Sequence, residues 1–287
     1  MKPALQHLLD LLDLEYIEEN IFRGQNRDLG GGRVFGGQVL AQALVAAYRT
    51  VEAGRRCHSL HAYFILPGDL AAPVVYDVDR IRDGGSFTTR RIRAIQHGRP
   101  IFNMAASFQR EEEGHSHQDE RPAAEGPDGL RSEIELIREI ADLIPEKLRP
   151  IYTQDRPFEF RPTDPVNPWA PEERAPRHAV WFRAVDRLPD TPWAHQALLA
   201  YASDHGLLPT ALRPHKLSFL QRGLQIASLD HALWIHRPFR VDEWLLYVME
   251  SPNAGGARGF ARGSIYTEAG TLVASVAQEG LMRLRVP

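Results

Sequence analysis

Cysteine is nearly absent from this chain: Cys57 is the single one among 287 residues. One cysteine excludes an internal disulfide and the cysteine clusters of structural zinc sites. The sequence also lacks a His-Glu-x-x-His segment, so neither a metal site nor another cofactor is predicted. A chain without disulfides is typical of a reducing compartment, and the expected location is the cytoplasm.

Long apolar runs and an excess of positive charge are missing as well. No run approaches the roughly 20 residues that span a bilayer, so no membrane span is predicted. The stretch 1–13 has acids between its leucines and no small-residue cleavage site, which predicts an amphipathic helix rather than a signal peptide. A formal charge of -3 offers no basic surface to nucleic acid.

What the chain does have is an internal repeat. In each half a helix-like run precedes a strand-like run: 36–44 before 61–67, and 196–202 before 231–238. A glycine pair, a strand that starts with arginine, and a turn into a last strand follow in both halves. The repeat covers about 170 residues with its linker, which favours two units of ordinary size.

Within each half, short glycine-containing turns join the strands, as at 83–86, 96–98 and 268–270. Because a parallel crossover needs a dozen or more residues, these strands are predicted to be antiparallel, which excludes a doubly wound nucleotide-binding fold. The run 36–47 is apolar and alanine-rich nearly all round, as expected of a helix inside a curved sheet. The predicted fold class is α+β, a tandem (double) hotdog in which each antiparallel β-sheet wraps around a central α-helix.

A segment rich in acids, proline and glycine separates the two units. We predict an N-terminal hotdog domain at 1–112, a linker at 113–176 and a C-terminal hotdog domain at 177–287. A capping box begins a helix of about four turns, predicted near 132–148. Frequent prolines leave only a short edge strand at 158–160 before the second unit starts.

The second unit carries polar residues on faces that are otherwise largely apolar. Asp204 lies on the second helix, where a carboxylate costs free energy unless it is paired. Gln278 shares a face of the last strand with apolar side chains, and Ser228 falls on the inward face of an earlier strand. Purely structural roles are also open: Asp204 as a helix end near Gly206, and Gln278 as a partner for backbone groups between the domains.

Seven segments, in order along nearly the whole chain, resemble bacterial acyl-CoA thioesterase II: RVFGGQ (33–38), YFILPGD (63–69), IRDGGSF (81–87), YASD (201–204), WIHRPF (234–239), EWLLY (243–247) and QEGLMR (278–283). The resemblance implies a double hotdog that hydrolyses acyl-CoA thioesters to free fatty acid and CoA, broad in chain length and favouring medium to long acyl groups. It also implies a triad of aspartate, threonine or serine, and glutamine, which match Asp204, Ser228 and Gln278. Serine in place of the commoner threonine is a mild departure.

The chemistry fits these residue types. Hydrolysis of a thioester needs a water that loses a proton while it is held in line with the carbonyl carbon. A carboxylate away from bulk water is a competent general base, which is the role predicted for Asp204. Gln278 and Ser228 both accept and donate hydrogen bonds, so they are predicted to position the water.

The first copy of the repeat is predicted to be non-catalytic. Matching the helices places Ala46 opposite Asp204, and matching the strands places His58 opposite Ser228. The first copy then lacks the residues that activate water. The prediction is one active site per chain, in the second unit.

Three further residues are candidates for substrate binding. Arg258 and Arg262 follow the glycine pair of the second unit and are candidates for the CoA phosphates, unless they are ordinary surface arginines. His58 lies in the degenerate copy of the site, where a structural histidine is the alternative. The expected partners are the acyl-CoA substrate and further copies of the chain, in a homodimer or a higher homo-oligomer.

Three alternative functions stay open. A hotdog enoyl-thioester hydratase needs an acid and a histidine aimed at one carbon, whereas Asp204 and His205 diverge by about 100° on a helix. Nucleophilic catalysis by Cys57 with His58 is disfavoured, because adjacent residues on a strand point to opposite faces. A non-catalytic acyl-CoA-binding protein that keeps the fold is the third alternative.

Overall fold

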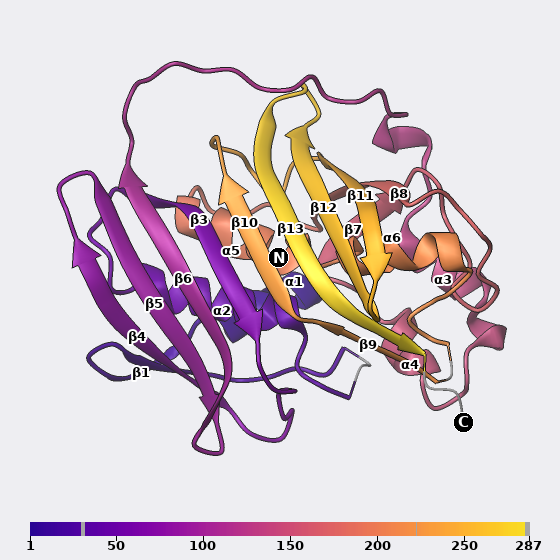
Figure 1. The fold of residues 1–287 in the computed structure, drawn as a ribbon, viewed down its shortest axis with the longest axis horizontal. Coiled ribbons are helices and arrows are strands. Elements are labelled where there is room, and N and C mark those ends of the chain that lie inside the picture. Colours follow the sequence, from indigo (N-terminus) through magenta and orange to yellow (C-terminus); the bar gives the residue numbers. More distant parts are fainter. Residues whose placement is uncertain (30–31, 222, 285–287) are drawn as a thin grey trace.

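The computed structural model describes residues 1–29, 32–221 and 223–284. In this part of the chain thirteen strands form one sheet, and all its pairs are antiparallel. Figure 1 shows the sheet in front of two long helices, α2 (Gly36–Tyr48) and α5 (Pro192–Ser203). These helices confirm the two helix-like runs of the repeat.

The N-terminal unit begins with α1 (Pro3–Leu12), whose buried residues recur at helical spacing and confirm the predicted amphipathic helix. Its strands follow the spatial order β1-β2-β4-β5-β6-β3. Their bounds are β1 (Glu15–Glu18), β2 (Ile21–Gly24), β3 (Arg55–Phe64), β4 (Val74–Asp83), β5 (Phe87–Gln96) and β6 (Arg99–Arg110).

The C-terminal unit continues the same sheet in the order β10-β13-β12-β11-β8, with β9 paired to β13, and β7 (Phe158–Pro162) of the linker adds the edge strand beside β8. Two short helical segments, α6 (Leu207–Leu212) and η3 (Arg213–His215), follow α5. The strands are β8 (Arg177–Ala184), β9 (Leu224–Ser228), β10 (Asp230–Ile235), β11 (Leu245–Gly255), β12 (Arg258–Thr267) and β13 (Leu272–Leu284).

The two units join through β3 and β10. The antiparallel pairs run from Asp230 with Tyr63 to Trp234 with Ser59, and the buried Leu60 pairs with the buried Leu233. The double hotdog expected from the sequence is confirmed, with its two sheets fused into one. We keep 1–112 and 177–287 as the proposed bounds of the two units.

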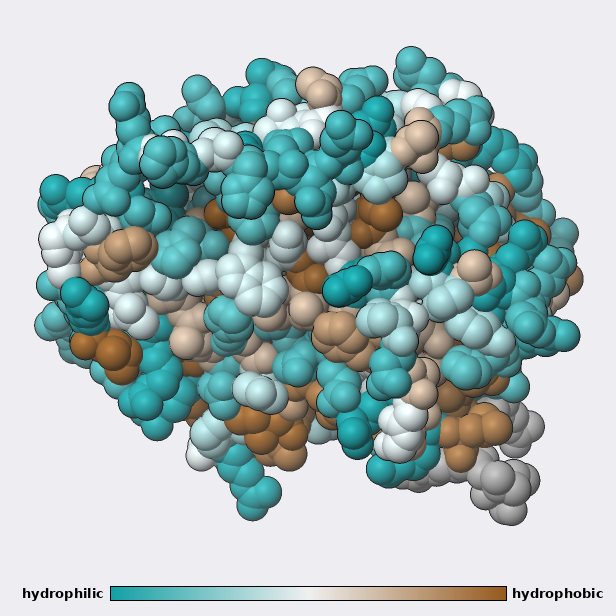
Figure 2. All heavy atoms as spheres, turned by 45° about the horizontal axis from the view of Figure 1, so that its top comes forward, coloured by the Kyte–Doolittle hydropathy of each residue, from teal (hydrophilic) through white to brown (hydrophobic). Residues whose placement is uncertain are grey.

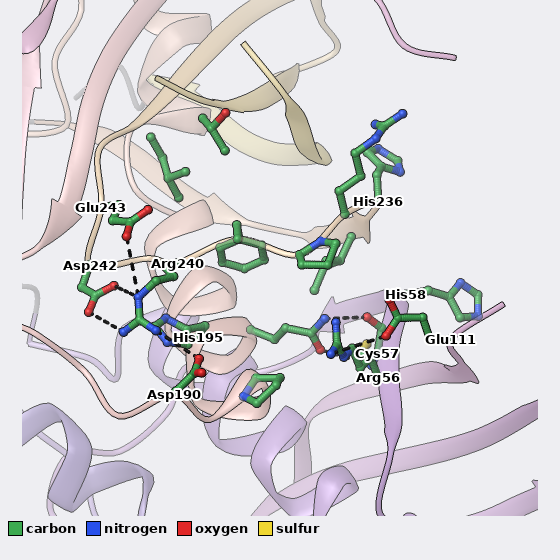
Figure 3. A pocket seen from close by; sticks show the side chains of 18 of the residues that line it. Arg56, Cys57, His58, Glu111, Asp190, His195, His236, Arg240, Asp242 and Glu243 are labelled. Atoms are coloured by element: carbon green, nitrogen blue, oxygen red, sulfur yellow. Dashed lines mark hydrogen bonds and ion pairs between the residues drawn. The ribbon is translucent and has the colours of Figure 1, made fainter. Parts of the chain in front are cut away.

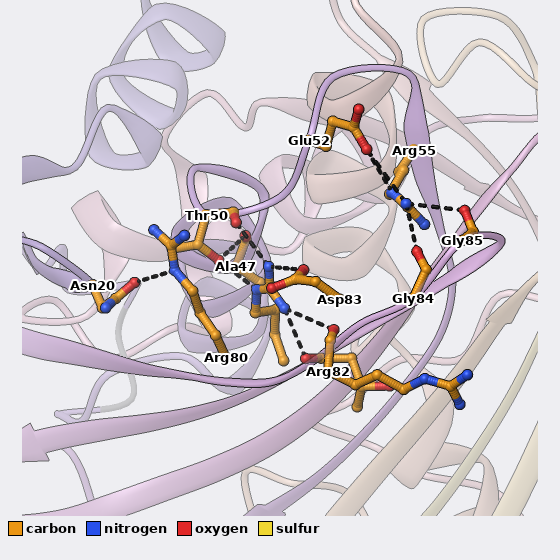
Figure 4. A network of polar contacts seen from close by, with 12 residues as sticks. Asn20, Ala47, Thr50, Glu52, Arg55, Arg80, Arg82, Asp83, Gly84 and Gly85 are labelled. Carbon is orange, nitrogen blue, oxygen red and sulfur yellow. Dashed lines mark hydrogen bonds and ion pairs between the residues drawn. The ribbon is translucent and has the colours of Figure 1, made fainter.

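Both central helices are buried along nearly their whole length: residues 37–47 of α2 and 194–203 of α5. The C-terminal end of α2 is closed by Arg90, which is 1% exposed. Its guanidinium donates to the carbonyl of Thr50 (2.9 Å) and to Asp83 Oδ1 (2.6 Å), while the Thr50 hydroxyl donates to the carbonyl of Ala47 (2.8 Å; Figure 4). The Thr50 hydroxyl thus satisfies a terminal carbonyl of α2, and the Arg90 cation opposes the negative end of the helix dipole.

The linker corrects one prediction. The helix expected near 132–148 is interrupted: α3 (Glu133–Glu139) has the predicted capping box, but a single 3-10 turn, η2 (Ala141–Leu143), follows it. Pro145 stops further helix because a proline in a helix interior clashes with the preceding turn. The next helix, α4 (Arg149–Thr153), has its proline in the first turn, where proline is tolerated.

Elsewhere the linker follows expectation. Residues 111–126 form no helix or strand and run along the top of the view in Figure 1, before the short turn η1 (Pro127–Gly129). The edge strand β7 (Phe158–Pro162) confirms the predicted strand at 158–160, and among the described strands it pairs with β8 alone.

The face of the molecule in Figure 2 is mostly hydrophilic, with hydrophobic residues in small separate groups. Among the described residues, no helix has the length and apolar character to cross a membrane.

Candidate active site

Asp204 lies where α5 ends. It is the C-cap of the helix, and Gly206 follows with φ 77°, a left-handed conformation that turns the chain directly into α6. The backbone of Asp204 therefore does end the helix, as the structural alternative predicted. Its carboxylate does not reach solvent, however, because the side chain is only 5% exposed.

Four buried polar side chains meet at this helix end: Asp204, Gln278, His231 and Ser203, which we call the inner cluster. Gln278 Nε2 lies 2.6 Å from Asp204 Oδ1 and 3.1 Å from His231 Nδ1. His231 Nε2 lies 2.9 Å from Ser203 Oγ. Gln278 Oε1 is buried and has no hydrogen-bond partner among the described residues.

Two glycines bring α2 against this cluster. A Cβ added to Gly36 would lie 2.7 Å from Asp204 Oδ2, and one added to Gly37 would lie 2.4 Å from the carbonyl oxygen of Tyr201. Only glycine allows α2 to begin so close to the end of α5. The Asp204 carboxylate thus lies near the positive, N-terminal end of the α2 dipole. It also lies at the negative, C-terminal end of α5, the helix that carries it.

The start of α2 also presents backbone donors. Phe35 is the N-cap and makes no side-chain cap. In the described part of the chain, the N–H groups of Gly36 and Gly37 donate to no acceptor. Free N–H groups at a helix start are suited to a developing oxyanion.

Ser228 lies on the same face of the sheet as Gln278. It is the last residue of β9 and pairs with Gly280 of β13, two positions beyond Gln278. Residues opposite each other in an antiparallel pair share a face, as do residues two apart on one strand. In the described structure the Ser228 hydroxyl makes no hydrogen bond to Asp204 or Gln278, so two of the three predicted catalytic residues are in direct contact.

The candidate arginines do not face the inner cluster. Ala261 pairs with Gln278, so strand alternation places Arg258 and Arg262 on the opposite face of the sheet. Both are exposed and paired with carboxylates, Arg258 with Glu279 and Arg262 with Glu250.

His58 lies at the other end of α5. Its Nε2 is 2.8 Å from Ser107 Oγ, and burial lowers its pKa. It lines a cavity of about 1180 Å³ at the start of α5, together with His195 and Arg240 (Figure 3). Asp204, Ser228 and Gln278 do not line this cavity.

The sheet register refines the match between the copies. Strand β3 has an extra residue after Cys57, and residues 229–231 include one extra residue opposite 278–279. The inward side chains on either side of the extra residue are Cys57 and Leu60 in the first unit, and Ser228 and His231 in the second. Cys57 thus corresponds to Ser228 and Leu60 to His231, whereas the sequence match placed the neighbouring His58 opposite Ser228.

The last strands match from their turns. Gly98 and Gly270 both have positive φ, and Ala106 lies eight residues after Gly98 as Gln278 lies eight after Gly270. Both side chains are buried. The first copy therefore has alanine at the position of the amide.

Sequence reasoning missed His231 and Ser203. Strict alternation through 226–234 placed Ser228, Asp230 and Ala232 on one face, which left His231 outside. An extra residue between β9 and β10 reverses the alternation, so that His231 is 1% exposed and Asp230 bonds the backbone N–H of Glu279. The available signal was the histidine at the start of the strand-like run 231–238, a polar residue in a strand that the repeat predicts.

Comparisons with known proteins agree with this architecture. A family model described as acyl-CoA thioesterase matches residues 148–281, and one described as acyl-CoA thioesterase N-terminal domain matches 25–109. Acyl-CoA thioesterase 2 of Haemophilus influenzae is 42% identical over 283 residues, which cover 99% of both chains. Human acyl-coenzyme A thioesterase 8 is 38% identical, over 96% of this chain and 88% of the relative.

Solved structures give the same result. The crystal structure of acyl-CoA thioesterase II TesB2 from Mycobacterium marinum has a TM-score of 0.80 and 44% identity, and it covers 97% of this chain and 98% of its own. A protein with a hot dog fold from Alicyclobacillus acidocaldarius, at 20% identity and a TM-score of 0.78, supports the fold. The chain therefore belongs to the acyl-CoA thioesterase II family of thioester hydrolases.

Proposed function

We propose that this chain hydrolyses acyl-CoA thioesters to free fatty acid and CoA, with Asp204 as the general base. The observation that supports this most strongly is the buried contact of 2.6 Å between Gln278 Nε2 and Asp204 Oδ1. It holds a carboxylate away from bulk water, next to the N–H groups of Gly36 and Gly37, which donate to no described residue. General acid–base catalysis by a positioned side chain contributes about 10²- to 10⁴-fold to rate.

The inner cluster suggests how water is held. Both N–H bonds of the Gln278 amide are engaged, so Oε1 is the atom that Gln278 offers to the site. A water that donates one O–H to Asp204 and the other to Gln278 Oε1 keeps a lone pair for the thioester carbon. Ser228 on the same sheet face supplies a further hydroxyl for positioning.

The proposed hydrolysis accounts for each bond that forms or breaks and for the proton that moves. The water oxygen bonds to the thioester carbonyl carbon while its proton passes to Asp204. The negative charge that develops on the carbonyl oxygen is stabilised by the N–H groups of Gly36 and Gly37. When the carbon–sulfur bond breaks, Asp204 returns the proton to the sulfur, and CoA leaves as the free thiol.

Two alternatives have less support. Burial raises the pKa of Cys57 to about 12, so its thiol is protonated and is a poor nucleophile. For a hydratase, His205 would have to act with Asp204, but its Nε2 is 2.9 Å from Glu133 and its ring stacks on Phe160. His231 is closer to Asp204, at 3.8 Å, but both of its ring nitrogens face other members of the inner cluster.

We extend the proposal to the finer points that the family resemblance suggests. We infer a preference for medium to long acyl chains and a homodimer or higher homo-oligomer. We also infer a cytoplasmic location, with which the buried, free thiol of Cys57 is consistent. Rates across a graded series of acyl-CoA lengths and light scattering of the purified protein test the first two.

The central test is release of free thiol from acyl-CoA. Asp204→Asn is expected to lower kcat about 10³-fold, because the amide accepts no proton from water at neutral pH. Asp230→Asn is the matched control: Asp230 is half-buried, and an amide oxygen can still accept from Glu279 N–H, so kcat should stay within about twofold. Equal rates for Asp204→Asn and wild type would overturn the proposal and favour a non-catalytic acyl-CoA-binding protein.

A further inference from the structure

We propose that His231 is a positioning residue for the hydrolysis: it sets the orientation of the Gln278 side-chain amide, and Ser203 holds its tautomer. The inference rests on the proposed function of Gln278. It follows from the directions of the hydrogen bonds in the inner cluster.

Each hydrogen bond has one possible direction. The amide nitrogen of Gln278 can only donate, so His231 Nδ1, 3.1 Å away, accepts. The ring proton is then on Nε2 and is donated to Ser203 Oγ at 2.9 Å. Ser203 Oγ in turn donates to the carbonyl of Ala200 at 3.0 Å, which accounts for every proton in the chain of bonds.

The surroundings keep this arrangement in place. Ser203 is fully buried, and the Tyr247 hydroxyl donates to its carbonyl at 3.0 Å. His231 is 1% exposed, and burial lowers its pKa, which agrees with a neutral ring that has one accepting nitrogen. The ring and its partner serine are therefore held by the end of α5 and by β11.

Asp204 by itself would leave the amide of Gln278 less well defined. The terminal torsion of a glutamine has a broad preference, so a single hydrogen bond to Asp204 Oδ1 leaves the amide plane free to turn. His231 supplies the second acceptor, on the other N–H. If the Gln278 amide were flipped, Oε1 would face the Asp204 carboxylate and His231 Nδ1. All three groups accept hydrogen bonds, so no hydrogen bond could form between them. The histidine thus directs Oε1 to the side where water or substrate must satisfy it.

The first unit has neither group at these positions. Leu60 corresponds to His231 and Ala106 to Gln278, and both are buried apolar residues. The nearby His58 turns its Nε2 to Ser107 and lines the cavity at the start of α5. The pair of histidine and amide thus belongs to the second unit, which is also the unit that carries Asp204.

Two isosteric variants separate positioning from packing. His231→Asn places an amide oxygen near the position of Nδ1 and can still accept from Gln278. His231→Gln places its polar atoms near the position of Nε2, where they reach Ser203 but not Gln278. We expect His231→Asn to keep kcat within about threefold of wild type and His231→Gln to lower it about 10- to 100-fold, with KM for acyl-CoA nearly unchanged in both.

Thermal unfolding of both variants provides the comparison with a purely structural role. If kcat falls equally in His231→Asn and His231→Gln, or follows the loss of stability, His231 is structural and the inference is wrong. If Gln278→Leu leaves kcat unchanged, the proposed function itself fails.

The tautomer can be measured without activity. A long-range ¹H–¹⁵N spectrum of protein with ¹⁵N-labelled histidine, with the His231 signals assigned by their loss in His231→Asn, should show a neutral ring protonated at Nε2. A ring protonated at Nδ1 would contradict the inference even if Asp204 and Gln278 prove catalytic.

Discussion

The two central helices end in opposite ways. The C-terminal end of α2 meets the buried guanidinium of Arg90, which hydrogen-bonds Thr50 and Asp83. The C-terminal end of α5 carries the Asp204 carboxylate, an anion at the negative end of its own helix. The first arrangement stabilises the helix. The second is unfavourable locally and is offset by the positive start of α2 at Gly36.

Corresponding strand positions also differ. Ala106 of the first unit presents only a buried methyl group, whereas Gln278 of the second leaves Oε1 without a partner among the described residues. Cys57, at the position of Ser228, is buried, and burial raises the pKa of its thiol. A duplicated fold can thus keep one helix end for stability and the other for chemistry.

The strongest test of this division exchanges each key strand residue for leucine. Gln278→Leu removes both the contact to Asp204 and the free acceptor, and it should lower kcat about 10²- to 10³-fold in the thiol-release assay. Phe108→Leu is the control: Phe108 is buried on the last strand of the first unit and packs on Tyr48, so the change should lower stability while kcat per folded molecule stays unchanged. A large fall in kcat for Phe108→Leu would show that both units contribute to the chemistry.

Arg90→Met tests the stabilising end. It leaves the buried carbonyl of Thr50 without its donor and removes the ion pair with Asp83, so we expect a loss of about 3 kcal/mol in the free energy of unfolding by urea. The kcat of the folded fraction should be that of wild type. Arg91→Met is the control, because Arg91 is exposed, and its ion pair with Asp79 should contribute less than about 1 kcal/mol.

Gly36→Ala tests the contact between the two helices. The added Cβ would lie 2.7 Å from Asp204 Oδ2 and 3.0 Å from the ring of Phe64, so the carboxylate must shift. We expect kcat to fall about 20-fold, since small displacements of a positioned group have large effects on rate. Gly85→Ala, which meets nothing within 4 Å, should leave kcat unchanged. An active Gly36→Ala enzyme would show that the close approach is dispensable.

Ser228 should give the smallest effect. Its hydroxyl has no bond to Asp204 or Gln278 in the described structure, so Ser228→Ala is expected to lower kcat about tenfold, as a positioning contribution. Ser228→Thr keeps the hydroxyl and should stay within about twofold. Ser107→Ala removes the hydroxyl that faces His58 in the first unit and should leave kcat unchanged. If Ser107→Ala and Ser228→Ala have equal effects, Ser228 has no special role.

The fold could be predicted largely because its signals are local. His97 and Gly98 both have positive φ, 50° and 72°, as a two-residue hairpin turn requires, and such turns force neighbouring strands to be antiparallel. The capping box shows where the linker helix begins, but it does not show how far the helix runs before Pro145. Closeness in sequence to the glycine pair does not place Arg258 and Arg262 at the site, because strand alternation turns both to the other face of the sheet.

Two of the buried site residues can be recognised from the sequence, and a third cannot. Asp204 and Gln278 stand out in the sequence because each is polar on a face that is otherwise largely apolar. His231 does not, because one extra residue between β9 and β10 reverses which side chains face inward, and period-two alternation carries no trace of it. The match of the two copies was one residue off at Ser228 for a related reason, since the extra residues after Cys57 and between β9 and β10 shift the alternation.

By itself, the sequence determined the antiparallel hairpins, the two buried helices and the unequal acid, because turn residues and apolar periodicity act over a few neighbouring positions. The tertiary structure alone decided that the sheets fuse at β3 and β10 and that Gly36 meets Asp204. It also decided that Gln278 is held between a carboxylate and a histidine. These contacts join distant segments, and only the packing of one unit against the other brings them together.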